Sequence, residues 1–458
     1  MKRRLKDFAV LCGGRLEGAD GPWTGVNTDS RHLAAGELYL ALRGPRFDGN
    51  VFVGAVAAAG AAGAVVDRPA EDATLPLIHV EDGQQALTRA AAAWRTRYAG
   101  VVVGVAGSNG KTTVKEMIAS ILALRGPCLA TRGNLNNHIG VPLTLLRLDD
   151  EHVSAVVEIG ANHAGEVASL VEVVRPHVGL ITNAGAEHLE GFGDLDGVAR
   201  AEGEMVAGLE AGGTAVLNAD DAYFDQWRAM TRARVMSFGI DRKADYSAAD
   251  IVETLQDEGF RTTFTLRTPV ASVAVRLNVG GRHNLRNALC AAAAAQAAGA
   301  TLDEVAAGLA GMQPVGGRLK PARTPSGARL IDDSYNANPS SMRAGIEVLT
   351  GLPGRAWLVM GDMGELGGEA HASHTEIGGF AREHGVERLF ATGPLSALTV
   401  ESFGAGASWY PDTESLARAV GDQLSDDVVL LVKGSRSNRL ERVVAALTGD
   451  AQLACGAH

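Results

Sequence analysis

The segment VVVGVAGSNGKTT at residues 101–113 decides the fold. Its first part, 101–105, is an apolar and mostly β-branched run, which is typical of a strand buried on both faces of a parallel sheet. A glycine-containing loop follows, and then a helical segment over 112–124. A strand, a loop and a helix in this order open a parallel-sheet nucleotide domain, and the GKT at 110–112 is the tail of a phosphate-binding loop.

The chemistry of this loop depends on its backbone and on two side chains. The residues that would hold a nucleotide phosphate are Gly107, Ser108, Asn109, Gly110, Lys111, Thr112 and Thr113. The N–H groups of the loop would bind phosphate oxygens, the Lys111 ammonium would neutralise phosphate charge, and the Thr112 hydroxyl would ligate Mg²⁺. The full pattern starts with a glycine where this chain has Val105, which leaves a merely structural glycine turn as an alternative. No NKxD guanine motif occurs, which disfavours a GTPase.

Length and composition set the scale of the molecule. A chain of 458 residues corresponds to about three domains. With 46% hydrophobic and 21% charged residues it has enough apolar material for buried cores. The net charge of −11 argues against a general nucleic-acid or membrane-surface binder, so we predict no nucleic-acid partner.

The compartment is inferred from the cysteines and from the start of the chain. The cysteines lie far apart and form no CxxC pair, which predicts reduced thiols; they are Cys12, Cys128, Cys290 and Cys455. The apolar run at 8–12 is too short for a signal peptide, and no apolar stretch of about 20 residues follows. We therefore expect a cytoplasmic protein without membrane insertion.

Hydrophobic patterning divides the chain into three α/β units, which we place at 1–98, 99–313 and 314–458. Strands are predicted in the first unit at 38–42, 64–66 and 77–80, with helices over 51–62 and 84–98. The central unit has buried-strand candidates at 101–105, 155–159, 178–182 and 214–217 and an alanine-rich helix over 284–298. The third unit has strands near 329–332, 356–360, 388–391 and 428–432.

Acidic and histidine side chains follow two of the central strands. Glu158 ends one strand, and a carboxylate at that edge of a parallel sheet can reach a metal beside the phosphate loop. A single glutamate there is usually only solvated, as a single loop histidine is usually only hydrogen-bonded. His188, Glu202 and Glu204 follow the next strand, and the presence of these possible ligands in addition to Glu158 favours a metal site.

Eight motifs, taken in order along the chain, resemble those of the Mur ligases of peptidoglycan synthesis. Within that family they are most similar to the members that add D-alanyl-D-alanine. The motifs are AGSNGKTT (106–113), GNLNNHIGVPLTLL (133–146), EIGAN (158–162), NAGAEHLEGFG (183–193), GRHNLRNALCAA (281–292), IDDSYNANPSSM (331–342), GDMGELG (361–367) and VKGSRSNRLE (432–441). The N-terminal segment 27–52 resembles the uridine-nucleotide domain of those members. The resemblance therefore covers nearly the whole chain in the right order.

The resemblance implies an α/β fold in which a central phosphate-loop, parallel-sheet ATPase domain is flanked by a small N-terminal uridine-nucleotide domain and a C-terminal Rossmann-like domain. It implies that ATP phosphorylates the terminal carboxylate of UDP-N-acetylmuramoyl-tripeptide, and that the amine of D-alanyl-D-alanine attacks the acyl phosphate. These small molecules would be the partners of a monomeric enzyme.

The same resemblance implies roles for individual residues. The catalytic set would be Lys111, Glu158, His188 and Glu202. One Mg²⁺ would bind Thr112 and Glu158, and a second would bind near His188 and Glu202. The ATP contacts outside the loop would be His283, Asn284, Asn287, Arg318 and Asp333. The substrate contacts would be Ser30, Arg31, Arg43, Phe47 and Asp48 in the N-terminal unit, with Lys433, Ser435 and Arg436 for the dipeptide or the reacting centre.

Glu202 is a departure from the family pattern. The family usually has a lysine carbamylated by CO₂ at this position, and here the spacing from His188 is kept. A glutamate carboxylate supplies a negative charge without bicarbonate, but on a shorter side chain. Either the metal shifts, a water bridges the gap, or Glu204 assists; loss of the second metal and of activity is the remaining alternative.

Two other functions stay open at this point. One is a sibling Mur ligase or a folylpolyglutamate-type ligase, which the DDSYNANPSSM and GDMGELG segments disfavour. The other is a non-catalytic nucleotide-binding partner, which Glu202 would permit. The presence of Lys111, Thr112, Glu158 and His188 argues against that second alternative.

Overall fold

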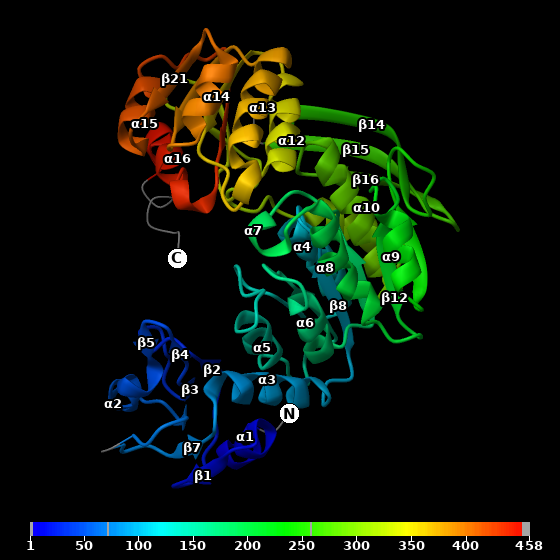
Figure 1. The fold of residues 1–458 in the computed structure, drawn as a ribbon. Helices are drawn as coiled ribbons and strands as arrows, with labels where there is room; N and C mark the ends of the chain where they lie inside the picture. Colours follow the sequence, from blue (N-terminus) through cyan, green and yellow to red (C-terminus); the bar gives the residue numbers. More distant parts are fainter. Residues whose placement is uncertain (1–2, 71–72, 257–258, 451–458) are drawn as a thin grey trace.

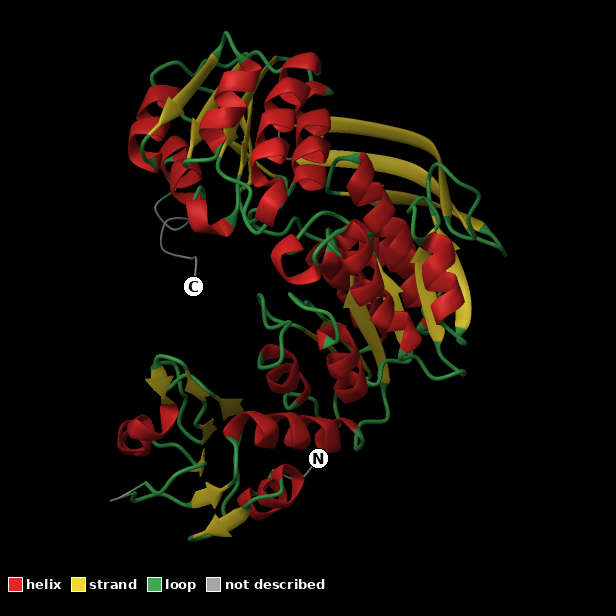
Figure 2. Cartoon of the chain, in the orientation of Figure 1, coloured by secondary structure: helices red, strands yellow, loops and turns green. Residues whose placement is uncertain are grey.

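The computed structural model describes residues 3–70, 73–256 and 259–450. Three α/β units follow one another along the chain, coloured from blue through green to red (Figure 1). Each unit is built on its own sheet, and helices cover these sheets (Figure 2). The predicted three-part α/β architecture is confirmed. Cys455 lies outside the described residues.

The N-terminal unit contains a five-stranded sheet in the order β1-β7-β6-β3-β2. Its strands are β1 (Arg15–Glu17), β2 (Val26–Asn27), β3 (Leu38–Leu40), β6 (Gly63–Val66) and β7 (Leu77–His79), and a small hairpin is formed by β4 (Arg43–Gly44) and β5 (Phe47–Asp48). Its helices are α1 (Leu5–Cys12), α2 (Val53–Ala58) and α3 (Gly83–Arg95). The predicted strands are present: β3 and β7 end two and one residues earlier than predicted, and β6 begins one residue earlier.

The central unit contains a six-stranded sheet in the order β13-β12-β11-β8-β10-β9. Every neighbouring pair is parallel, as the apolar runs predict. The strands are β8 (Val101–Ala106), β9 (Cys128–Ala130), β10 (Ser154–Glu158), β11 (Val178–Ile181), β12 (Thr214–Asn218) and β13 (Arg234–Phe238). The helices are α4 (Lys111–Leu122), α5 (Gly140–Leu145), α6 (Glu166–Val174), α7 (Leu189–Phe192), α8 (Leu195–Ala207), α9 (Phe224–Met230), α10 (Arg282–Ala297) and α11 (Leu302–Gly311).

A three-stranded antiparallel sheet interrupts this pattern. It consists of β14 (Ser247–Gln256), β15 (Gly259–Arg267) and β16 (Ser272–Leu277), and it extends from the central unit toward the C-terminal unit (Figure 1). The sequence analysis did not predict it. Most residues of β14 are exposed, and its charged residues give no continuous apolar run to recognise.

The C-terminal unit contains a six-stranded sheet in the order β17-β18-β22-β19-β20-β21, in which only β17 is antiparallel to its neighbour. Its strands are β17 (Lys320–Arg323), β18 (Arg329–Asp333), β19 (Arg355–Met360), β20 (Arg388–Thr392), β21 (Ala407–Tyr410) and β22 (Val428–Lys433). Its helices are α12 (Pro339–Thr350), α13 (Ala370–Glu383), α14 (Ser396–Phe403), α15 (Thr413–Gly421) and α16 (Glu441–Thr448).

The connections between units are short. The chain passes from the end of α3 at Arg95 to β8 at Val101, and from α11 at Gly311 to β17 at Lys320. The predicted domain boundaries after residues 98 and 313 fall in these connections and stay predictions. Among the described residues, no helix combines the length and the apolar character that crossing a bilayer requires.

Candidate active site

A cavity of about 580 Å³ lies where the central and C-terminal units meet. The central unit lines it with the phosphate loop, with residues that follow β10 and β11, and with the start of α10. The C-terminal unit lines it with residues from the ends of β18 and β22 and from the start of α12. Parallel sheets of this kind bind ligands outside the carboxyl ends of their strands.

The phosphate loop requires glycine at two positions. Gly107 has φ +117°, and a Cβ there would lie 2.1 Å from Thr182 Oγ1. Gly110 has φ +84°, and a Cβ there would lie 2.5 Å from Asn287 Oδ1. Val105 is buried inside β8, before the chain turns, so this position needs no glycine.

Lys111 lies at the start of α4 and points back over the loop. Its Nζ donates to the carbonyl oxygens of Gly107 and Ser108 and pairs with Glu187 Oε1 at 3.3 Å. Burial lowers the pKa of Lys111, but the nearby carboxylates of Glu187, Glu202 and Glu158 raise it above the ordinary value. The ammonium is therefore charged at neutral pH and is available to phosphate oxygens.

Glu158 and Thr112 are brought into direct contact. Thr112 Oγ1 donates to Glu158 Oε2 at 3.0 Å, and Asn136 Nδ2 donates to Glu158 Oε1 at 2.9 Å. Arg318 comes from the connection to the C-terminal unit, and its guanidinium donates to Thr112 Oγ1 at 3.0 Å. A hydroxyl and a carboxylate side by side are hard oxygen donors, the kind that Mg²⁺ prefers.

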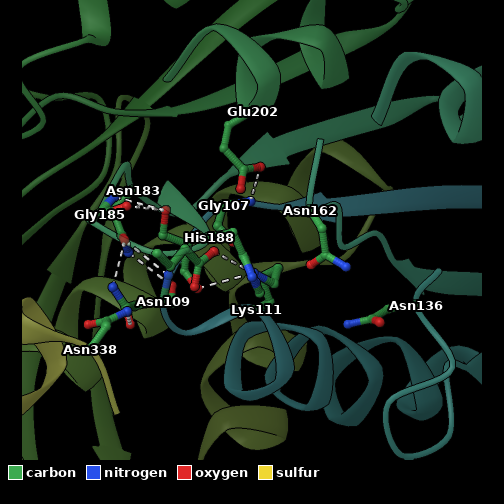
Figure 3. Close-up of polar contacts among 12 residues, drawn as sticks. Gly107, Asn109, Lys111, Asn136, Asn162, Asn183, Gly185, His188, Glu202 and Asn338 are labelled. Carbon is green, nitrogen blue, oxygen red and sulfur yellow. Dashed lines mark hydrogen bonds and ion pairs between the residues drawn. The ribbon is translucent and has the colours of Figure 1, made fainter. Parts of the chain in front are cut away.

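Glu202 comes from α8, on the other side of the loop (Figure 3). Its side chain is buried, and Oε2 accepts the backbone N–H of Gly107 at 2.6 Å. Burial raises the pKa of Glu202 to about 7, although the Lys111 charge and the Gly107 N–H act in the opposite direction. Gly107 is thus held at its N–H by Glu202 and at its carbonyl by Lys111.

The structure does not assemble His188 and Glu202 into a set of metal ligands. His188 Nδ1 instead lies 2.6 Å from Oε2 of Glu365, on the C-terminal unit. Within the described ranges, no three His, Cys, Asp or Glu side chains form a group that could hold a metal ion. The second metal site therefore stays a prediction. Glu204 is engaged elsewhere, because its carboxylate accepts the N–H groups of Gly165 and Ala168 at the start of α6.

Three predicted nucleotide contacts lie on the first turns of α10. Asn284 Nδ2 donates to Gly280 O at 2.8 Å and Asn287 Nδ2 donates to Asn284 Oδ1 at 3.1 Å. Removal from water, together with the charges of Lys433 and Arg286, lowers the pKa of His283 to about 4. All three line the cavity, and His283 is neutral at physiological pH.

The C-terminal unit contributes a buried ion pair. Lys433 Nζ donates to Asp333 Oδ2 at 2.6 Å, and Asp333 Oδ1 accepts the N–H of Leu319 at 3.2 Å. Nearby, the guanidinium carbon of Arg318 lies 4.3 Å from the centre of the Tyr335 ring, and that of Arg436 lies 5.2 Å from it. The predicted residues Arg318, Asp333 and Lys433 all line the cavity.

Ser435 lies just beyond β22 and is buried. Its hydroxyl donates to Ala337 O at 3.3 Å and accepts the N–H of Gly364 at 2.7 Å. It therefore holds together two loops of the C-terminal unit beside the cavity.

The predicted N-terminal substrate contacts lie on the separate N-terminal unit and do not line this cavity. Arg31 donates twice to the Asp29 carboxylate, at 2.9 and 2.7 Å, and holds the pKa of Asp29 well below its usual range. Arg43 donates to Asp67 at 2.7 Å, and Phe47 is 58% exposed. Ser30, on the loop after β2, is half-buried, and Asp48 caps the turn that follows β5. These positions stay predictions.

The sequence analysis missed the contacts between units. Asn109 in the phosphate loop accepts from Asn338 Nδ2 at 2.8 Å and donates to Ser340 Oγ at 3.0 Å (Figure 3). Glu365, the partner of His188 on the C-terminal unit, was also missed, and so was Glu187, which pairs with Lys111 inside the central unit. All lie within motifs that were recognised, but nothing in one sequence pairs residues so far apart.

Comparisons with known proteins agree along the whole chain. Residues 22–95 match the model of the Mur ligase family, catalytic domain; 105–295 match the Mur ligase middle domain; and 317–436 match the Mur ligase, glutamate ligase domain. The Escherichia coli UDP-N-acetylmuramoyl-tripeptide--D-alanyl-D-alanine ligase is 43% identical, over 97% of this chain and 98% of that protein.

Solved structures give the same result. A crystal structure of MurF from Acinetobacter baumannii has a TM-score of 0.90 at 35% identity, covering 98% of this chain and 99% of that one. MurF from Thermotoga maritima, solved in complex with ADP, has a TM-score of 0.81 at 25% identity, covering 93% of this chain and 98% of that one. The phosphate loop, the cavity between two units and these matches together place the chain in the Mur ligase family of ATP-dependent amide-bond ligases.

Proposed function

We propose that this chain joins D-alanyl-D-alanine to the terminal carboxylate of UDP-N-acetylmuramoyl-tripeptide, using ATP and passing through an acyl phosphate. The relatives that share its full length are named for this reaction. The observation that carries the proposal is the cavity in which the phosphate loop of one unit faces Asp333, Lys433 and Arg318 of the next.

The reaction brings a carboxylate close to a nucleotide phosphate, and the cavity residues offset the repulsion between these two negatively charged groups. Lys111 and Arg318 carry positive charge to the loop, and the N–H groups of the loop offer hydrogen bonds to phosphate oxygens. Thr112 Oγ1 and Glu158 Oε2 would hold Mg²⁺, which supplies charge neutralisation between phosphate oxygens. Asn136 keeps the Glu158 carboxylate oriented toward that position.

Residues on either side of the phosphate loop would hold the rest of the nucleotide. His283, Asn284 and Asn287 on α10 would contact the base, and Asp333 the ribose. Neutral His283 can both donate and accept a hydrogen bond, which suits a nucleotide base. Arg318 would reach a phosphate with the same guanidinium that now bonds Thr112.

Lys433 connects the nucleotide side of the cavity to the dipeptide side. It is held by Asp333 and by Asn336 O, so its ammonium has a fixed position at the end of β22. Lys433, Ser435 and Arg436 would lie at the reacting centre or around the incoming dipeptide. Arg31, Arg43 and the exposed Phe47 ring would bind the uridine nucleotide on the N-terminal unit.

We also propose that the enzyme acts as a monomer in the cytoplasm. The test is ATP-dependent ligation with a panel of UDP-muramoyl peptides as donors and D-alanyl-D-alanine, L-alanine or D-glutamate as acceptors. We expect ADP release only with the tripeptide and D-alanyl-D-alanine together.

The other outcomes each overturn the proposal in a distinct way. Ligation of L-alanine or D-glutamate without use of the dipeptide would identify a sibling ligase. Nucleotide binding without turnover for any donor and acceptor pair would identify a non-catalytic protein. Repeating the assay with added EDTA tests the Mg²⁺ requirement, and unchanged ADP release would exclude the metal role of Thr112 and Glu158.

A further inference from the structure

Two strained residues meet where the central and C-terminal units touch. His188, just before α7, has φ 50°, and Glu365, in the loop between β19 and α13, has φ 62°. The left-handed region is unfavourable for residues with a Cβ, so the surrounding structure must hold both residues there. Strain of this kind clusters at functional sites.

The contact between these residues is specific in both side chain and backbone. His188 Nδ1 lies 2.6 Å from Glu365 Oε2, and the N–H of Leu189 donates to Glu365 O at 3.1 Å. Close packing continues beyond them, because a Cβ at Gly367 would lie 3.3 Å from Glu190 Cγ. A backbone hydrogen bond fixes the register of the two segments, which an exposed ion pair alone does not.

The loop that carries Glu365 is built rigidly. Four successive N–H groups are bonded to partners in the same unit: Gly361 to Lys433 O, Asp362 to Asn438 Oδ1, Met363 to His374 Nε2 and Gly364 to Ser435 Oγ, at 2.7–3.1 Å. The side chains of Met363 and Leu366 are buried on either side of Glu365. The loop therefore carries Glu365 to a set position whenever the unit is docked.

We propose that Glu365 is a positioning residue for the ligation, which fixes the ring and the tautomer of His188. The inference rests on the proposed function, because His188 lines the nucleotide cavity. A carboxylate can accept a hydrogen bond but cannot donate one, so Glu365 Oε2 at 2.6 Å favours the tautomer with its proton on Nδ1 over the tautomer with its proton on Nε2.

This arrangement makes the orientation of His188 depend on the C-terminal unit. The same unit carries Lys433, whose backbone carbonyl accepts the N–H at the start of the Glu365 loop. Docking therefore brings Lys433 to the cavity and orients His188 in one step, and a separated unit leaves the histidine without its partner.

The kinetic test compares Glu365→Ala and Glu365→Gln with Glu369→Gln, which changes an exposed carboxylate four residues away. Partners that orient a functional histidine typically contribute 10–100-fold, so we expect kcat to fall by roughly that factor in Glu365→Ala. Glu365→Gln retains an acceptor and should lose less. The KM for ATP should change by less than about threefold, because the nucleotide contacts remain.

A double-mutant cycle with His188→Gln shows whether Glu365 acts through the histidine. We expect the kcat of the double variant Glu365→Ala/His188→Gln to be no lower than that of His188→Gln alone, because Glu365 has no histidine to orient in either protein. Additive losses, or an unchanged kcat in Glu365→Ala, would overturn the proposal.

The tautomer gives a readout that is independent of catalysis. In protein labelled with ¹⁵N-histidine, the His188 resonance is assigned by its loss in His188→Gln. We expect an Nδ1-protonated ring in the wild type and a shift toward the Nε2-protonated form in Glu365→Ala. If the wild type ligates no substrate, the proposed function is wrong, but this measurement still shows whether Glu365 sets the tautomer of His188. An Nε2-protonated ring in the wild type would overturn that role of Glu365.

Discussion

The central unit contacts its two neighbours through different kinds of side chain, apolar at one junction and polar around the cavity at the other. At the N-terminal junction one continuous apolar core runs from Phe8 and Trp94 to Leu148 and Val174. At the C-terminal junction the contacts around the cavity are polar, and Asn109–Asn338 is an example.

Backbone acceptors strengthen the apolar junction. Trp94 Nε1 donates to Leu148 O at 2.9 Å, and the buried Arg95 guanidinium donates to the carbonyls of Val174 and Arg175. Separating these units would expose apolar surface and leave buried donors without partners, whereas separating the polar junction exchanges hydrogen bonds with protein for hydrogen bonds with water. The site of chemistry therefore lies at the junction whose contacts cost less to separate.

The largest effect is expected from the loop at the polar junction. Lys111→Ala removes the charge that faces phosphate oxygens, and turnover should fall by about 10³ or more, because electrostatic contacts of this kind are each worth 10²–10³. The thermal unfolding temperature should stay close to that of the wild type. ADP release is the assay, and Lys6→Ala on the N-terminal unit is the matched control; normal ADP release from Lys111→Ala would remove this loop from the mechanism.

The next effect tests the apolar junction. Trp94 is fully buried, and Trp94→Ala should lower the free energy of unfolding by about 3–5 kcal/mol. Urea unfolding measures this, with Trp409→Ala as the control, since Trp409 is 44% exposed and should cost less than about 1 kcal/mol. Equal losses in the two variants would mean that the shared core does not hold the N-terminal unit.

Glu202 tests what holds the phosphate loop. Glu202→Ala leaves the buried Gly107 N–H without an acceptor, which costs about 1–3 kcal/mol, and kcat should fall by roughly 10². Glu202→Gln still offers an oxygen to that N–H and should remain within about tenfold of the wild type. Neither rate should respond to bicarbonate. A Gln variant as slow as the Ala variant would show that the negative charge, not the hydrogen bond, is required.

A smaller effect is expected at the contact between units. Asn109→Ala removes two hydrogen bonds to Asn338 and Ser340, worth about 0.5–1.5 kcal/mol each, while the backbone of the loop is unchanged. We expect kcat to fall about tenfold and the unfolding temperature to stay constant. A loss of unfolding free energy as large as that of Trp94→Ala would contradict the distinction between the junctions.

The last effect is a dependence of stability on pH. Because the folded-state pKa of His283 is lowered from 6.5 to about 4, the unfolded chain binds a proton first as pH falls. The stability that this neutral histidine contributes is present above pH 6.5 and is lost between pH 6.5 and 4, by no more than about 3 kcal/mol. Urea unfolding of His283→Gln should show a shallower decline over that window; an identical decline would assign it to other groups.

Local patterns predicted most of the parallel framework. β8 and β11 are apolar throughout, and β10 and β22 are apolar except for Ser154, Glu158 and Lys433 at their ends, so their burial on both faces could be read directly. β14 was missed because its residues are mostly exposed.

The candidate site likewise has one part that the local sequence predicts and another that it does not. The geometry of the phosphate loop follows from a local glycine pattern, whereas the partnership of His188 with Glu365 depends on how two units dock, and no spacing in the sequence encodes that. The metal role expected for Glu202 stays a prediction, and its contact with the Gly107 N–H could not be read from the sequence.

The antiparallel sheet has a mechanical consequence. Phe260 on β15 is 3% exposed and belongs to the C-terminal core, yet it packs so closely over Gly280 that a Cβ there would lie 2.2 Å from its ring. Pulling this ring out of its contacts would cost about 1.5–3 kcal/mol. A rotation of the C-terminal unit about an axis through Phe260 would leave this ring in both of its contacts, and each atom of the unit would then move in proportion to its distance from that axis.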